Sequence, residues 1–464
     1  MLDAARRMLA GERLYADLID LNPPFFFWLS QPAIVISRLG LDPADVLRVF
    51  VLLILGAMLA LAWPLTRDAP AIRAGFVLFA FAIPLGHFAE REHLIFGLMV
   101  PYVAAMSVSA REPASGRSGG WGWIAIAVGI AAGVAMAIKP PAALVLLILT
   151  MQPCIRDRSL RPVLRAENLA AAGTLAVALA AILAFAPAYL DAVSRYGALY
   201  AEFSRGTLRQ LLFRDIYPLS VWLALSVGAL TLRSVENRHR IGVLMLASAG
   251  FLAAAVAQGK GFGYHYFPAM GFAVMTLLEL VAAPVMNHRH TAGVARRVVA
   301  GAALLLVLVL PFIVAIERFS GKAGSDVVER RGLSAALADL GPGSRVAIFS
   351  VRLADAYPIL LERRWQHVLS MPHLWFTGLT EGQASAALWR RVGENLRDGA
   401  PEAIIVRAPL PTERTRGDLA VEYLPIVCRD PAARAALAGY ERTAHAGGYD
   451  IYRPAPGGSG ACGA

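Results

Sequence analysis

The chain has 464 residues, of which 57% are hydrophobic and only 17% are charged, and its mean hydropathy is +0.55. A soluble domain rarely has so few charged residues, so this composition excludes an ordinary soluble enzyme and predicts an α-helical polytopic membrane protein. The net charge of +11 does not indicate a nucleic-acid partner, because the arginines lie in short loops between apolar runs, which is typical of membrane topology.

Residues 1–42 are predicted to form an external loop that contains two short helices. Within it, residues 1–22 begin with a short amphipathic stretch, which is followed by Gly11 and then by the carboxylates Asp17 and Asp20. This order predicts a helix that ends in a turn, and the two carboxylates are candidate catalytic groups. The competing interpretation is a plain turn in which both carboxylates are solvated.

A second apolar helix is predicted from Phe25 to about Leu39. It is rich in aromatic residues and interrupted by Pro32, so we expect it to lie at the membrane interface rather than to cross the bilayer. No cleavable signal peptide is predicted before it, because the first 22 residues are polar and lack an apolar core.

Residues 43–318 are predicted to form a transmembrane helical domain of ten spans. Each span is a run of apolar residues, although several are shorter than the ~20 residues that usually cross a bilayer. The spans are expected at 43–64, 74–88, 93–109, 121–138, 140–154, 168–190, 216–232, 241–258, 264–285 and 298–317.

Arginines set the predicted topology, because they gather in every second loop between the spans. The positive-inside rule makes those loops cytoplasmic. The remaining loops and the C-terminus are then external, and they hold most of the polar clusters, including arginines in residues 191–215 that could meet anionic headgroups. The arginines of the cytoplasmic loops are Arg67, Arg73, Arg111, Arg117, Arg156, Arg158, Arg161, Arg165, Arg233, Arg238, Arg240, Arg289, Arg296 and Arg297.

Residues 319–454 have the composition of a soluble domain. Apolar runs at 345–351 and 402–407 predict buried strands, and the amphipathic stretch 382–398 predicts a helix between them. A last strand is expected at 449–452. Strands that alternate with helices predict a small external α/β domain.

The end of the chain and its cysteines carry little structural signal. Residues 455–464 are rich in glycine and are predicted to be disordered. The three cysteines, Cys154, Cys428 and Cys462, do not have the spacing of metal ligands, and we expect no disulfide framework.

Five ionisable residues lie within seven positions between two predicted spans: His87, Glu90, Arg91, Glu92 and His93. Such groups at the rim of a bilayer are costly unless they face a polar cavity. Glu90 or Glu92 could serve as a general base held by Arg91. On a helix, His87, Glu90 and His93 could instead share one face and bind a divalent metal. The alternative to both is a charged interfacial turn.

A second polar cluster contains Lys260, Tyr264, His265 and Tyr266, with glycines between them. Glycines let the backbone approach a ligand closely, and a lysine with a histidine and tyrosines suits a phosphate whose lipid tail stays in the bilayer. Lys139, between two apolar runs, is another cation at the same level. The competing interpretations are a lysine that snorkels beside an aromatic belt and, for Lys139, a simple helix end.

Several segments resemble the GT-C membrane glycosyltransferases. Ala-Arg-Arg-Met-Leu-Ala-Gly (5–11), Leu-Tyr-Ala-Asp (14–17) and Asn-Pro-Pro (22–24) resemble the first external loop of that superfamily. Ala-Ile-Lys-Pro-Pro (137–141) is similar to its Thr-Lys-Gly-Pro segment. The stretch from Lys260 to Pro268 is similar to its Lys…His-Tyr…Pro motif. The nearest groups in style are the bacterial enzymes that transfer arabinose to lipid A and the protein O-mannosyltransferases.

This resemblance implies a bacterial inner-membrane enzyme with a periplasmic C-terminal domain. It would move a sugar from a polyprenyl-phosphate donor to a glycan, lipid or protein acceptor of the cell envelope. By the same resemblance, Lys260, His265 and Lys139 would bind the lipid phosphate, and Glu90 or Glu92 would deprotonate the acceptor or hold a divalent metal.

The chain departs from the family pattern at its beginning. The family carries an acidic residue shortly before the Ala-Arg-Arg-like helix, preceded by a first transmembrane helix, and we expect both to be absent from this sequence. Two other hypotheses therefore remain open. One is a secondary transporter or lipid flippase in which Glu90, Glu92 and His93 form a proton relay. The other is a non-catalytic, truncated relative.

Overall fold

The computed structural model describes ten segments of the chain. They are residues 1–83, 87–108, 120–202, 205–283, 290–352, 356–372, 383–408, 421–455, 457 and 460–462. Arg111, Arg117 and Arg289 of the predicted cytoplasmic loops lie outside these residues.

The described chain divides into two compact units, and each is presented by itself. The helical unit consists of Val35–Phe185 and Arg205–Glu317. The α/β unit consists of Met1–Ile34, Ala186–Ser204 and Arg318–Ala464.

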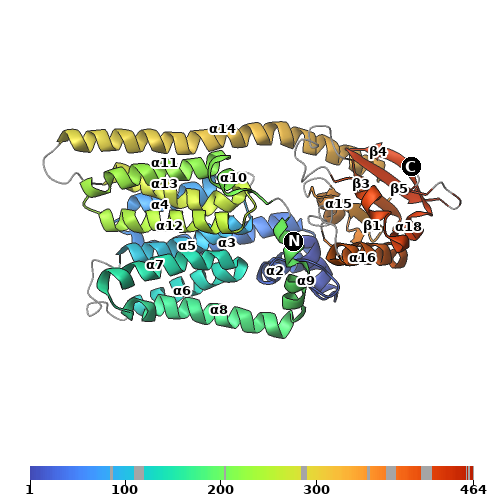
Figure 1. Ribbon diagram of the computed structural model, residues 1–464, viewed down its shortest axis with the longest axis horizontal. Coiled ribbons are helices and arrows are strands. Elements are labelled where there is room, and N and C mark those ends of the chain that lie inside the picture. Colours follow the sequence, from blue (N-terminus) through green and yellow to red (C-terminus); the bar gives the residue numbers. More distant parts are fainter. Residues whose placement is uncertain are drawn as a thin grey trace. The chain divides into compact units, whose positions relative to one another are not determined.

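Every one of the ten predicted spans coincides with a helix of the helical unit (Figure 1). The agreement follows from physics, because a backbone inside a bilayer can satisfy its hydrogen bonds only as a helix or a closed barrel. The helices are α3 (Pro43–Ala62), α4 (Pro70–Val77) with the π-helix η2 (Leu78–Ala82), α5 (Arg91–Val108), α6 (Gly120–Ile138), α7 (Ala143–Asp157), α8 (Ala166–Phe185), α11 (Ile216–Thr231), α12 (Arg238–Ala257), α13 (Phe267–Ala282) and α14 (His290–Ala336). Shorter elements join them: η1 (Pro64–Thr66), η4 (Pro140–Ala142), η5 (Arg161–Leu164), α10 (Leu208–Phe213), η6 (Leu232–Ser234) and η7 (Gly263–Tyr266).

Among the described residues, five helical stretches are long and apolar enough to cross a membrane. They are Pro43–Ala62, Ala166–Phe185, Arg238–Ala257, Gly263–Ala282 and Gly293–Ile313. The protein is thus a polytopic helical membrane protein, while the number of ten spans stays a prediction.

Burial within the helical unit separates a central layer from a peripheral one. The apolar window of the Gly263–Ala282 stretch is 83% buried, whereas that of α3 is 11% buried and that of α8 is 17% buried. Both peripheral helices expose large apolar side chains, such as Leu53 and Phe185. Helices that are apolar on their exposed faces suit a hydrocarbon solvent rather than water.

The α/β unit contains a five-stranded sheet in the order β2-β1-β3-β5-β4. The strands β2, β1 and β3 are parallel, whereas β5 pairs antiparallel with β3 and β4 pairs antiparallel with β5. The elements are β1 (Arg345–Phe349), α15 (Ala356–Glu362), β2 (Gln366–His367), α16 (Gln383–Gly399), β3 (Ala403–Arg407), α17 (Tyr423–Val427), α18 (Pro431–Leu437), β4 (Tyr440–Ala446) and β5 (Tyr449–Pro454).

The predicted strands correspond to β1, β3 and β5, and the predicted helix corresponds to α16. The edge strand β4 was not predicted, because its side chains are mostly polar and exposed. The pair Gly447 and Gly448, both at positive φ in the turn between β4 and β5, is the hairpin signal that could have revealed it.

Residues Met1–Ile34 of the N-terminal segment belong to the α/β unit. They contain α1 (Leu2–Leu9) and most of α2 (Phe25–Ser37), and α9 (Ala188–Glu202) belongs to the same unit. The guanidinium of Arg7 on α1 donates to the carbonyl of Leu369 at 2.7 Å, and the amide of Ile19 donates to the carbonyl of Ser370 at 2.8 Å. These contacts join residues more than 350 positions apart, so no local sequence pattern could indicate them. The division between the two units falls between residues 317 and 318, inside the continuous helix α14, and the boundary expected from the sequence lies at residue 318.

The expectation of no disulfide was wrong, since Cys428 and Cys462 are bonded, with Cα atoms 5.7 Å apart. Cys154 is buried and not in a disulfide. The predicted disorder of the tail was also wrong at residues 460–462, where the Ala461 amide donates to the carbonyl of Leu437 at 3.1 Å. The rest of the tail beyond 457 lies outside the described residues. The two bonded cysteines are 34 positions apart, and only the folded chain brings them together.

Replacing both Cys428 and Cys462 by serine is expected to destabilise the α/β unit by about 2–4 kcal/mol, because the bond closes a long loop in the unfolded chain. Thermal unfolding of the full-length protein in detergent measures this change. A reductant should lower the unfolding midpoint of the wild type and leave that of the double variant unchanged. Peptide mapping that finds both thiols free in protein from the host membrane would contradict the assignment.

Candidate functional site

A buried ion pair lies at one end of the helical unit. Glu92, in the first turn of α5, forms an ion pair with Lys139, which lies between α6 and η4. The Nε2 atom of His265, in η7, is 3.7 Å from the same Oε1 of Glu92. The Glu92 and His265 side chains are almost fully buried, and that of Lys139 is 12% exposed. The structure therefore brings together three of the predicted site residues from three separate segments of the chain.

Two polar atoms of this group have no hydrogen-bond partner among the described residues: Oε2 of Glu92 and Nδ1 of His265. Buried polar atoms are nearly always paired in folded proteins, so each such atom needs a reason. Burial lowers the pKa of Lys139 to about 8, although the carboxylate of Glu92 acts in the opposite direction. The group thus offers a substrate one acceptor and one ring nitrogen beside an ion pair.

Aromatic rings surround this group. The Tyr264 ring lies edge-on to His265, with centroids 4.5 Å apart, and Lys139 Nζ is 5.8 Å from the Tyr264 centroid. The His87 ring lies 6.4 Å from the same tyrosine and 6.1 Å from Tyr217, which the sequence analysis did not single out. Aromatic faces stabilise a nearby cation and provide a flat apolar surface for a ring-shaped ligand.

Glu90 is half-buried immediately before α5 and carries a perturbed pKa. Burial and the negative charge of Glu92 raise its pKa, Arg91 and Lys139 oppose both effects, and the result is a pKa of about 7. A carboxylate that exchanges its proton near neutral pH has the property that a general base requires. Glu90 is therefore the better base candidate of the two glutamates, since Glu92 is held by Lys139.

The predicted metal trio of His87, Glu90 and His93 is not assembled. The Nε2 atom of His93 donates to the carbonyl of Ala80 at 2.7 Å, and its Nδ1 accepts from the amide of Ala89 at 3.2 Å. Both ring nitrogens are thus committed to the backbone. Over the described ranges, no three His, Cys, Asp or Glu side chains are grouped to hold a metal. The spacing argument assumed a helix from residue 87, but α5 begins only at residue 91.

Lys260 lies in the loop between α12 and η7 and is 95% buried, with 5% of its surface exposed. Burial lowers its pKa, the positive charge of the nearby Arg205 acts in the same direction, and together they bring the pKa to about 8. The amide of Gly206 donates to the carbonyl of Gly259 at 2.8 Å, which connects the two cation-bearing segments. Neighbouring cations repel each other, and an anion that contacts both removes this cost. Lys260 and Arg205 therefore form a candidate anion-binding site.

Tyr266 is turned into the protein and not toward a ligand. Its side chain is 1% exposed, and its hydroxyl donates to the carbonyl of Leu211 at 2.7 Å. This bond attaches η7 to α10. Tyr266 therefore has a structural role, and its predicted contact with substrate stays a prediction.

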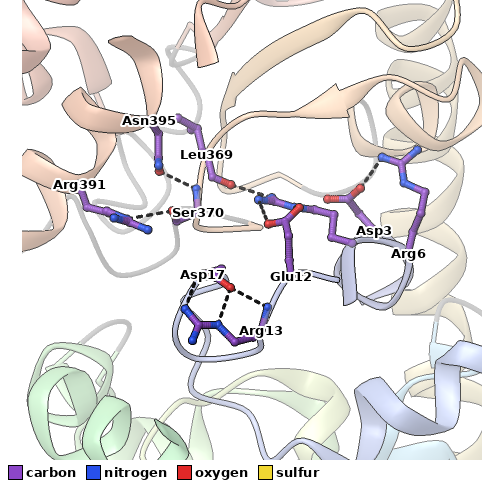
Figure 2. Close-up of polar contacts among 10 residues, drawn as sticks. Asp3, Arg6, Glu12, Arg13, Asp17, Leu369, Ser370, Arg391 and Asn395 are labelled. Atoms are coloured by element: carbon purple, nitrogen blue, oxygen red, sulfur yellow. Dashed lines mark hydrogen bonds and ion pairs between the residues drawn. The ribbon is translucent and has the colours of Figure 1, made fainter. Parts of the chain in front are cut away.

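Asp17 and Asp20 belong to the α/β unit, whereas Glu90 and Glu92 belong to the helical unit. Asp17 accepts from the amide and the guanidinium of Arg13, at 2.9 and 3.0 Å, and this arginine holds the pKa of Asp17 below its usual range (Figure 2). Asp20 accepts from the amides of Leu21 and Asn22, both at 2.7 Å, as in an Asx turn. Both carboxylates thus shape local turns, although Asp20 is buried and not solvated.

Comparison with known proteins gives one line of evidence on the family. No family model and no curated protein matches the sequence. Among solved structures, the crystal structure of ArnT from Cupriavidus metallidurans bound to undecaprenyl phosphate is similar, with a TM-score of 0.56 and 15% sequence identity. The likeness covers 97% of this chain and 92% of ArnT. At this identity it shows the fold, and it confirms the resemblance to GT-C membrane glycosyltransferases at that level.

Proposed function

We propose that the protein is a GT-C-type membrane glycosyltransferase that moves a sugar from a polyprenyl-phosphate donor to an acceptor in the cell envelope. The observation that carries this proposal is the placement of two largely buried cations in the helical unit, Lys139 paired with Glu92 and Lys260 in the loop that leads to His265. The shared fold with ArnT, a protein with bound undecaprenyl phosphate, supports the same class of donor.

Two features support a site on the outer face of the membrane. The arginine-rich loops lie at the opposite helix ends from Glu92 and Lys260, and the positive-inside rule assigns those loops to the cytoplasm. The Cys428–Cys462 bond suits an oxidising compartment such as the bacterial periplasm. We therefore assign the α/β unit to the periplasm of a bacterial inner-membrane protein.

In the proposed reaction, the acceptor hydroxyl attacks the anomeric carbon of the sugar, and the bond from that carbon to the phosphate oxygen breaks. Glu90 takes the proton of the hydroxyl. The polyprenyl phosphate leaves with the negative charge, which Lys260 and Arg205 stabilise. The ion pair of Glu92 with Lys139 holds His265 and Tyr264 in position.

Replacing Lys260 by alanine is expected to weaken binding of undecaprenyl phosphate about 10- to 100-fold, which corresponds to the loss of one charge-assisted hydrogen bond. Native mass spectrometry of the full-length protein in detergent measures the retained lipid. In the host, the same variant should lose a glycan modification of the envelope and accumulate the lipid-linked donor. Arg158→Ala, an exposed cation at the far end of α7, is the matched control. Equal lipid retention by Lys260→Ala and wild type would refute the phosphate contact.

A further inference from the structure

A polar cavity lies in the helical unit, away from the candidate site. Its volume is about 410 Å³, within the range of small-molecule sites. Apolar side chains of η1 and of the end of α5 form one wall. The polar lining is Arg67, Asp68, Glu236, Asn237, His239 and Arg240.

This cavity and the candidate site lie at opposite ends of the same two helices. At one end, Glu92 in the first turn of α5 lies close to His265, which follows α12. At the other end, the Nε2 atom of His239 at the start of α12 donates to the carbonyl of Met106 near the end of α5, at 3.2 Å. The two helices are thus antiparallel neighbours (Figure 1). The 18 residues of α5 span about 27 Å, close to the thickness of the hydrocarbon core. The cavity therefore lies at the other membrane face, among the arginine-rich loops.

Hydrogen bonds and an ion pair fix the positions of two side chains that line the cavity, Arg240 and Asn237. Arg240 donates to the carbonyl of Asp68 at 2.7 Å and pairs with the buried Glu279 at 3.4 Å, and Asn237 donates to the same Glu279 carboxylate at 2.8 Å. Two buried atoms of the lining nevertheless have no hydrogen-bond partner among the described residues, Nε of Arg240 and Oδ1 of Asn237. One is a donor and the other is an acceptor, so a matching ligand carries both functions.

We propose that this cavity binds the zwitterionic headgroup of phosphatidylethanolamine from the cytoplasmic leaflet. Arg67 and Arg240 are the phosphate donors. Asp68 and Glu236 are the acceptors for the ammonium group. The lining has two carboxylates and two arginines, and Arg240 also pairs with Glu279, so the cavity has no excess of positive charge, which disfavours a purely anionic headgroup. The apolar wall faces the first carbons of the lipid. This proposal does not depend on the reaction proposed above, because none of its residues belongs to the candidate site.

Native mass spectrometry with defined lipids tests the proposal on the full-length protein in detergent. Dioleoylphosphatidylethanolamine should be retained in preference to dioleoylphosphatidylglycerol. Arg67→Gln and Glu236→Gln remove charges from exposed lining side chains, so the fold should persist, and each should reduce this retention about tenfold. Arg233→Gln, an exposed arginine of η6 outside the lining, should have no effect.

Competition with soluble compounds separates the headgroup from a simple anion. Phosphoethanolamine at high concentration should displace the lipid, while inorganic phosphate should not. Equal retention of the two lipids, retention that neither Arg67→Gln nor Glu236→Gln changes, or displacement by inorganic phosphate would each overturn the proposal. If the transferase assay shows no activity but the protein still retains phosphatidylethanolamine in preference to phosphatidylglycerol, the proposed function fails and the headgroup proposal is supported.

Discussion

Replacing Lys139 by methionine is expected to destabilise the protein by about 3–5 kcal/mol, because the buried carboxylate of Glu92 then loses its counter-ion. The Glu92 side chain is 4% exposed, so water cannot replace the lysine. His265 is a poor substitute, since its Nε2 lies 3.7 Å from the carboxylate and must be protonated to attract it. The unfolding midpoint of the full-length protein in detergent measures the loss.

The double variant Lys139→Met with Glu92→Gln provides the internal control. Removing both charges avoids an unpaired buried carboxylate, so the double variant should be more stable than Lys139→Met alone. Arg158→Met serves as the control for loss of an exposed cation. Additive losses in the double variant would mean that the two residues do not interact. That result would also remove the basis for a rigid group around His265.

This pair shows where prediction from sequence ends. The apolar runs predict the helices, because a membrane helix satisfies its own backbone hydrogen bonds and needs no distant partner. Glu92 and Lys139 were both predicted as site residues, but their direct pairing was not, since 47 positions separate them. Pairing between helices depends on the order in which the helices pack, and hydropathy does not encode that order.

Failures of prediction have the same origin. The metal trio depended on a helix that was assumed to begin at residue 87, whereas α5 begins four residues later, at residue 91. The Cys428–Cys462 bond and the contact of Arg7 with Leu369 join distant segments. The interpretation of Asp17 and Asp20 as turn residues agrees with their hydrogen bonds. Both residues lie in a different unit from Glu90. Local chemistry was thus readable from the sequence, while long-range partnership was not.

Replacing Glu90 by glutamine is expected to lower the rate of sugar transfer about 10²- to 10⁴-fold, the usual contribution of a general base. The wild-type rate should also fall as pH drops through about 7, because the carboxyl of Glu90 is then protonated and cannot accept the proton of the acceptor. The glutamine variant should show a low rate without this step. Initial rates with a polyprenyl-phosphate sugar between pH 5 and 9 measure both effects, with Asp157→Asn at the exposed end of α7 as the control for loss of a carboxylate outside the site.

The stability of the protein should change with pH in the opposite direction to the rate of sugar transfer. Comparing the two therefore separates a catalytic role of Glu90 from a structural one. The pKa of Glu90 is raised from its ordinary value of 4.5 to about 7, so the folded protein binds this proton more tightly than the unfolded chain does. Its contribution to stability is therefore fully present below the ordinary pKa and is lost as pH rises to about 7. A catalytic base predicts activity that increases over the pH range in which this stability decreases. If transfer and the unfolding midpoint of the wild type instead decrease together as pH rises, or if Glu90→Gln keeps full activity, Glu90 acts only on the structure and the base must be another residue.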